Sequence, residues 1–313
     1  MEKELTIEER VARGRKIKIL KENLFAWGLM LFPMVLFVIF YVYINLNSFS
    51  MAFQSKTIDG SVKWVGFNNF KTFISAISQE DGLLRVGLVN SLKIYFINLL
   101  ICVPLYIFFS FILFKKMPGH NAMRAIVMIP NVISGMIVAL VFKKFVDNAL
   151  PEIINSITGR EDFPPLLSTP RTTFGTTIFY MIWVSFGLSL LSYSNAMGEI
   201  DAEVIDSAHI DGIDNMLLEL WYIILPLIYP TLETFLIVGF TGILSNEGPL
   251  VTFYGAYAPS ETYTVGYYYS SMIIRGMASE YNMLAAGGFM MSLIVVPSTQ
   301  LLKKFLDKFL PEV

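Results

Sequence analysis

Two groups of residues in this chain have the types and spacing for a specific task. The first is an acidic segment, 198–226. It has seven acids and neither Lys nor Arg between Gly198 and Leu220: Glu199, Asp201, Glu203, Asp206, Asp211, Asp214 and Glu219. The second group is neutral polar and aromatic side chains inside apolar runs. Two His and one Cys are too few for a typical His/Cys metal site, and the Gly-x4-Gly-Lys-Ser/Thr loop that binds ATP does not occur in the sequence. The two groups therefore indicate binding and mechanical coupling rather than catalysis.

The acidic segment predicts a short helix that ends sharply. Ala202–Ile210, called the lever helix below, places Ile205, Ala208 and His209 on one face at three- and four-residue spacing. Asp211-Gly212 then supplies a stop, because Gly readily adopts the left-handed conformation that ends helices. A rigid helix between two apolar segments can transmit the movement of a partner protein. Its acidic charge predicts a basic socket on that partner. A solvated connector is the alternative.

Composition places both groups in a membrane protein. Of the 313 residues, 55% are hydrophobic and 15% charged, whereas a soluble domain has roughly 25% charged residues. Crossing the hydrocarbon core takes about 20 apolar residues. Six spans are expected, at 24–46, 88–114, 125–145, 172–197, 221–244 and 283–302. The Tyr-rich stretch 263–277 is expected to be a short re-entrant or interfacial piece, and an interfacial belt is favoured over a lining of the outer mouth. The sequence therefore predicts an all-α integral membrane protein with a six-helix polytopic bundle.

Basic residues predict the orientation of this bundle. Three segments are basic: residues 1–23 with seven Lys or Arg, the connection after the second span with Lys115, Lys116 and Arg124, and the tail with Lys303, Lys304 and Lys308. Because Lys- and Arg-rich segments stay in the cytoplasm, both termini and the acidic segment are expected there. The expected organisation is a cytoplasmic basic segment 1–23, a transmembrane domain 24–305 containing the acidic segment, and a cytoplasmic tail 306–313.

Three stretches of the sequence resemble one protein family. The acidic segment, with Asp206-Ser207-Ala208, Gly212 and Ile223-Ile224-Leu225-Pro226, is similar to the pattern Glu-Ala-Ala, three residues, Gly, nine residues, Ile-x-Leu-Pro. The other two stretches are Trp64-Val65-Gly66-Phe67-Asn68-Asn69-Phe70, and Met117-Pro118-Gly119 through Arg124 to Ile129-Pro130. On these motifs the chain resembles the sugar-type permease subunits of bacterial ABC importers, in the maltose and glycerol-phosphate permease group, over residues 24–305.

The chain departs from the family pattern in the acidic segment. Asp206 and Ser207 replace Glu and Ala, and one additional residue separates Gly212 from Pro226. A one-residue insertion rotates a helix by about 100°. We therefore expect residues 214–217 to absorb it.

The resemblance implies a fold, a role and a set of partners. It implies a type I ABC importer permease, a transport subunit rather than an enzyme, in the plasma membrane of a bacterial cell. The implied partners are a second, different permease subunit, two ATPase subunits that hold ATP and Mg, and an extracellular solute-binding protein that delivers a carbohydrate, with an oligosaccharide expected. No cofactor, metal or nucleic acid is expected on this chain. The residues implied to contact the ATPase are Glu203, Asp206, Ser207, Ala208, His209, Asp211 and Gly212.

A carbohydrate pathway needs aromatic surfaces and neutral hydrogen-bonding groups. Polar groups inside spans usually face the bundle interior. The candidates are Tyr180, Trp183, Ser185 and Tyr193 in the fourth span, and Ser245, Asn246 and Glu247 at the end of the fifth. The resemblance implies that Ser185 and Asn246 occupy sugar-contacting positions, whereas ordinary bundle packing is the alternative for the aromatic residues.

Three other functions are open from the sequence. A secondary transporter driven by an ion gradient would have inverted repeats and paired intramembrane charges, whereas Glu233 and Lys93 are the charges expected well inside spans. A membrane enzyme would need a cluster of His, acids or Ser-Lys at one membrane face. An ABC permease for another solute would be favoured by a strongly charged pathway, and the uncharged candidates favour a sugar.

Overall fold

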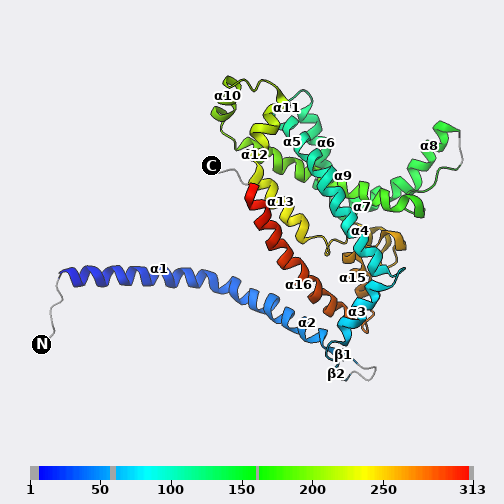
Figure 1. The fold of residues 1–313 in the computed structure, drawn as a ribbon, viewed down its shortest axis with the longest axis horizontal. Coiled ribbons are helices and arrows are strands. Elements are labelled where there is room, and N and C mark those ends of the chain that lie inside the picture. Colours follow the sequence, from blue (N-terminus) through cyan, green and yellow to red (C-terminus); the bar gives the residue numbers. More distant parts are fainter. Residues whose placement is uncertain (1–6, 57–60, 160–161, 310–313) are drawn as a thin grey trace.

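The computed structural model describes residues 7–56, 61–159 and 162–309, with the backbone alone for residues 7–14 and 17. Helices dominate the fold (Figure 1). The α-helices are α1 Ile7–Phe37, α2 Ile44–Ala52, α3 Asn68–Ser78, α4 Leu83–Ile97, α5 Val103–Phe114, α6 His120–Val132, α7 Gly135–Lys144, α8 Leu150–Thr158, α9 Pro170–Gly198, α10 Ala202–Ile210, α11 Met216–Glu219, α12 Leu225–Leu227, α13 Tyr229–Thr241, α14 Leu250–Tyr254, α15 Val265–Ile274 and α16 Tyr281–Leu306. The π turns are η1 Val38–Tyr43, η2 Asn98–Cys102, η3 Phe145–Ala149 and η4 Leu220–Ile224. The remaining elements are the antiparallel strands β1 Gln54–Lys56 and β2 Val62–Trp64, and the 3-10 turns η5 Ser260–Thr262 and η6 Asp307–Phe309.

The helices confirm an all-α polytopic membrane fold. Four continuous helices in the described chain are long and apolar enough to cross a membrane: Lys18–Ala52, Leu83–Phe114, Pro170–Gly198 and Tyr281–Phe309. Two bent helix pairs bring the number of spans to as many as six. Each of the six expected spans overlaps one of these segments. Of the expected terminal segments, residues 1–6 and 310–313 lie outside the described residues, and residues 7–23 belong to α1.

The third expected span, 125–145, is broken rather than straight. α6 and the helical segment Gly135–Thr158 meet at 102°. The break lies at Ile133, whose backbone is extended at φ −94° and ψ 150°. Pro130 lies less than one turn before it, and proline weakens a helix because it lacks the N–H that would bond the preceding turn. The chain therefore leaves the bundle through α7, and α8 projects to the side (Figure 1).

The fifth expected span, 221–244, is also bent. Segments Met216–Leu227 and Tyr229–Thr241 meet at 70°. Ile228 lies at the bend, and Pro230 occupies the first turn of α13. Proline is well suited to this position, because the first N–H groups of a helix have no partner within the helix. The bend lets one span combine the short α11–α12 segment with α13.

The hairpin end of the bundle is held by asparagine side chains. Asn69 Nδ2 donates hydrogen bonds to the carbonyl oxygens of Ala52 at 2.9 Å and Gln54 at 2.7 Å. Asn282 Nδ2, at the start of α16, donates to the same Gln54 oxygen at 2.5 Å. The motif Trp64 to Phe70 therefore joins the first long helix to α3 and α16. The lever helix α10 lies at the opposite end of the molecule (Figure 1).

Most of the Tyr-rich stretch, residues 263–272, is buried in the bundle, so the expectation that its tyrosines form an interfacial belt was wrong, whereas Ile273, Ile274 and Met277 are exposed. It forms α15, and Tyr263 and Tyr267 are 2% and 0% exposed. The Tyr267 hydroxyl accepts a hydrogen bond from the Ala258 N–H at 2.8 Å and donates one to the Gly255 oxygen at 3.0 Å. A tyrosine can be buried when its hydroxyl has partners, and these two come from the loop before α15.

Candidate functional site

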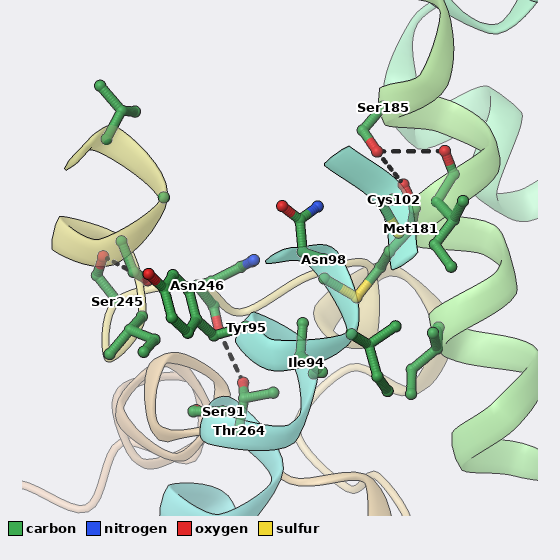
Figure 2. A pocket seen from close by; sticks show the side chains of 17 residues that line it. Ser91, Ile94, Tyr95, Asn98, Cys102, Met181, Ser185, Ser245, Asn246 and Thr264 are labelled. Atoms are coloured by element: carbon green, nitrogen blue, oxygen red, sulfur yellow. Dashed lines mark hydrogen bonds between the residues drawn. The ribbon is translucent and has the colours of Figure 1, made fainter. Parts of the chain in front are cut away.

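A cavity lies between the α4–η2 segment, α9 and α13. Its volume is about 370 Å³, within the range of about 300–1,000 Å³ that is common for small-molecule sites. Much of its lining is aliphatic, and none of the described lining residues is charged. The polar lining residues are Ser91, Tyr95, Asn98, Ser185, Ser245, Asn246 and Thr264 (Figure 2). The cavity thus combines apolar surface with neutral hydrogen-bonding groups.

Three of the residues expected in the solute pathway meet in this cavity, namely Ser185, Ser245 and Asn246. The Ser185 hydroxyl is 2.9 Å from the Tyr106 hydroxyl and donates to the Met181 oxygen at 2.7 Å. The Asn246 side-chain oxygen accepts from the Gly248 N–H at 2.8 Å. Among the described residues, the Asn246 amide nitrogen has no acceptor. It is therefore free to donate to a solute.

The structure places the other four expected pathway residues outside the cavity. Tyr180 is 5% exposed and packs with Phe142, at a ring distance of 4.9 Å. Tyr193 is 1% exposed and belongs to a core of α5, α9 and η4. Trp183 lines a separate apolar groove beside α6 and α7. Glu247 accepts a short hydrogen bond from Ser270 in α15. The same helix and loop therefore carry both cavity-facing and packing residues.

Three polar residues of the second span, Ser91, Tyr95 and Asn98, also line the cavity and were not expected from the sequence. Asn98 begins the π turn η2, and its amide has no hydrogen-bond partner within the described chain. The ring of Tyr95 lies edge-on to Phe240, with ring centroids 5.9 Å apart. Asn98 and Asn246 reach into the space from different walls (Figure 2). The available signal was an amide side chain inside an apolar run, which is costly in a membrane unless it faces the bundle interior or a water-filled cavity.

The loop that carries Ser245 and Asn246 is held by the start of α15. The Thr264 hydroxyl donates to the Asn246 backbone oxygen at 2.8 Å. At Gly266, an added Cβ would lie 2.5 Å from the Ser245 oxygen, so α15 approaches this loop more closely than a side chain allows. The backbone position of both polar residues is therefore set by direct packing rather than left to a free loop.

The lever helix α10 is short and ends in a Schellman motif. The Ile213 N–H bonds the Ala208 oxygen at 3.0 Å, and the Gly212 N–H bonds the His209 oxygen at 3.1 Å. Gly212 has φ +93°, the left-handed conformation that this motif requires. Of the residues implied to contact a partner, Ala208 is 5% exposed, and the others are exposed: Glu203, Asp206, Ser207, His209, Asp211 and Gly212.

Comparisons with known proteins identify homologues of this chain. No protein-family model matches the chain. The Multiple sugar-binding transport system permease protein MsmF of Streptococcus mutans is 22% identical over 241 residues, which cover 77% of this chain and 81% of that protein. The chain is a homologue of sugar-transport ABC permeases.

Solved structures show the same fold. One is a chain of a bacterial ABC transporter involved in the import of the acidic polysaccharide alginate. It superposes on the present chain with a TM-score of 0.78 and 21% identity, covering 94% of this chain and 99% of that one. The bacterial alginate ABC transporter in complex with its alginate pentasaccharide-bound periplasmic protein gives a TM-score of 0.73 and 20% identity, covering 92% of this chain and 94% of the other. The type I importer permease fold expected from the sequence is therefore confirmed.

One acid of the permease's acidic segment points inward rather than toward a partner. Glu219 is 2% exposed, and its carboxylate lies 2.5 Å from the Lys115 Nζ and 3.4 Å from the His209 Nε2. Nothing in the residue pattern distinguishes this acid from the six others. Glu219 therefore belongs to the packing between the lever helix and α5.

The structure offers two places for the extra residue of this segment. Residues 213–215 are irregular, and the Asn215 side chain caps α11 by accepting from the Leu217 N–H at 2.8 Å. The segment then continues into the π turn η4, Leu220–Ile224. A π turn bonds i to i+5 and so holds one residue more than an α turn. The expected position, 214–217, stays a prediction, because the irregular residues 213–215 overlap it and η4 is a second place that holds one residue more.

Proposed function

We propose that this permease is the transmembrane subunit of an ATP-driven importer and forms half of the pathway for a carbohydrate, with an oligosaccharide expected. The observation that carries the proposal is the cavity that unites Ser185 of α9 with Ser245 and Asn246 after α13. A sugar presents hydroxyl groups and apolar ring faces, and this cavity offers neutral polar groups beside aliphatic surface. Its relative MsmF is a permease of a multiple sugar-binding transport system.

The proposed assembly adds several other chains. A second, different permease would complete the pathway, an extracellular solute-binding protein would deliver the solute, and two ATPase subunits would bind ATP and Mg below the lever helix. Ile210 supports an interface there, because it is 86% exposed at the end of an acidic helix, and interfaces commonly surround apolar contacts with polar ones. ATP binding would shift the pathway between two states through its different affinity for each.

The proposed location is the plasma membrane of a bacterial cell, with both termini in the cytoplasm. Lys115 and Lys116 lie on the α5–α6 connection. Lys115 contacts Glu219 of α11, which in turn lies 3.4 Å from His209 at the end of the lever helix. Basic connections favour the cytoplasmic side. The exposed lever helix would then face the ATPase subunits.

The charge of the lining favours an uncharged carbohydrate. The described lining residues include no Lys or Arg that could pair with an acidic sugar. The alginate transporter, by contrast, handles an acidic polysaccharide. The intramembrane charges also lie elsewhere: Lys93 lies over the Phe174 ring at 5.9 Å from its centroid, and Glu233 is buried next to Asp307 and Lys303. An ion-driven pathway through this cavity therefore has no charged residue of the described lining to use.

Asn246→Ala is expected to raise the solute concentration needed for half-maximal uptake while preserving assembly. The change removes a free amide donor from the cavity, together with the side-chain oxygen that accepts the Gly248 N–H at 2.8 Å. A neutral hydrogen bond contributes about 0.5–1.5 kcal/mol, which corresponds to a rise of about 2- to 12-fold. The measurement is uptake of labelled neutral oligosaccharides against concentration in cells that carry the variant.

The matched control is Asn45→Ala, because the Asn45 amide is exposed and bonds the Tyr41 oxygen of its own helix. This control is expected to leave the uptake kinetics unchanged. Unchanged kinetics for Asn246→Ala as well would remove Asn246 from the pathway.

A further inference from the structure

A buried carboxylate fastens the lever helix to the second span. Glu219 lies between Lys115 and His209. Its Oε1 is 2.5 Å from the Lys115 Nζ, and its Oε2 is 3.4 Å from the His209 Nε2. Its side chain is 3% exposed, and that of Lys115 is 21% exposed. The three residues, called the latch below, come from the end of α10, from α11 and from the residue that follows α5.

The surroundings of the latch make its partners interdependent. The Lys115 Nζ lies 5.8 Å from the ring centroids of both Phe111 and Phe114, so aromatic surface replaces part of its water. A buried charge is costly unless it is paired. Removing one partner of a buried pair is therefore far more disruptive than removing an exposed ion pair. The three side chains of the latch are therefore expected to stay in contact as long as α10 and α5 remain adjacent.

The latch contacts the second span, a wall of the cavity that no short chain connection joins to α10. α10 follows α9 and precedes α11 in sequence, so α9 and the fifth span are already attached to it by short connections. The second span is attached to it by the Lys115–Glu219 pair and by the packing of Ile205 against a core that includes Tyr106 and Phe111. That span is continuous from Leu83 to Phe114 and presents Tyr95, Asn98 and Cys102 to the cavity. A displacement of α10 can therefore act on the second span through Glu219.

We infer that Glu219 is a positioning residue for transport, which transmits movement of the lever helix to the cavity wall formed by the second span. This inference rests on the proposed importer function, in which an ATPase moves α10. Coupling between distant sites needs more than spatial adjacency. The decisive observable is therefore a response of the second span to ATP that depends on the latch.

Cys102 supplies that observable. It is the chain's single cysteine, and it lines the cavity from the second span while being only 1% exposed, so its alkylation reports movements that open this wall. The experiment uses the whole importer, purified with its ATPase subunits and reconstituted in lipid. The rate of Cys102 alkylation by N-ethylmaleimide is followed by mass spectrometry with and without ATP and Mg²⁺, and ATP hydrolysis is measured in the same samples. We expect ATP to change the alkylation rate in the wild type.

Glu219→Gln is expected to reduce this ATP-dependent change by about 2- to 30-fold, the range that altered coupling commonly spans, while ATP hydrolysis continues. Asp214→Asn is the matched control, since Asp214 is an exposed acid of the same segment without an ion pair in the described chain. Lys115→Met is expected to act like Glu219→Gln, whereas Lys116→Met removes an adjacent, exposed charge and is expected to retain the wild-type response.

Lys115→Arg keeps the charge, so this variant should retain the ATP-dependent change in Cys102 alkylation that Lys115→Met loses. This comparison tests the latch even if Glu219→Gln fails to assemble. A wild-type response in Glu219→Gln, or in Lys115→Met, would overturn the latch. A wild type that hydrolyses ATP without any change at Cys102 would also overturn it. A wild type that purifies without an ATPase would overturn the proposed importer function itself, and the two failures are therefore distinguishable.

Discussion

Gly212→Pro is expected to abolish uptake while leaving the permease in the membrane. Gly212 has φ +93°, and its N–H bonds the His209 oxygen at 3.1 Å. Proline fixes φ near −65° and has no N–H, so the substitution removes both features of the turn. The strain costs on the order of 2–3 kcal/mol, or roughly 30- to 150-fold in the population of the native turn. The apolar spans that insert the chain are unchanged.

The measurement pairs uptake with the amount of the variant in the membrane fraction. Gly212→Asn is the control, because Asn is the other residue that commonly occupies this position at helix ends. It is expected to retain most of the uptake. Normal uptake by Gly212→Pro would show that the end of α10 does not need this turn, and the lever interpretation would fail.

Gly187→Val is expected to destabilise the bundle between α6 and α9. An added Cβ at Gly187 would lie 2.3 Å from the Val127 backbone oxygen and 2.8 Å from the Asn131 side-chain nitrogen. A backbone oxygen cannot rotate away, so the two helices would have to separate. Their separation would also break the bond from the Asn131 amide to the Val184 oxygen, which is 3.2 Å long.

Overpacking of this kind costs about 1–3 kcal/mol or more, which corresponds to a fall in Tm of about 2–12 °C. The measurement is the thermal stability of the purified chain in detergent, read from the loss of the monodisperse species on heating. Gly175→Val on the same helix is the matched control, because an added Cβ there has nothing within 4 Å. Equal Tm values for the two variants would contradict the close contact at Gly187.

The sequence predicted the spans well because each depends on a long apolar run. It did not predict where two of them break, since Pro130 and Pro230 occur in runs whose composition is otherwise like the rest. Other spans tolerate proline within a continuous helix, as at Pro33 and Pro297. Whether a proline breaks a helix depends on the packing around it, which the sequence alone does not reveal.

The candidate site was predicted in part. Ser185 and Asn246 were assigned to a pathway through resemblance, and the structure brings them to one cavity. Asn98 was missed because the resemblance implies solute contacts in the fourth and fifth spans and none in the second. Tyr193 looked equally suitable by composition, yet it is 1% exposed within the core. Residue type identified which groups could face a solute, whereas only the helix rotation in the folded bundle decides which ones do.

The most direct test of the central claim is purification of the tagged permease from its native membrane in mild detergent, with mass spectrometry of the chains that accompany it. The importer account predicts a second permease and an ATPase that carries the nucleotide-binding loop absent from this sequence. ATP hydrolysis by the purified complex should accompany them. A homogeneous chain without any nucleotide-binding partner would contradict the account.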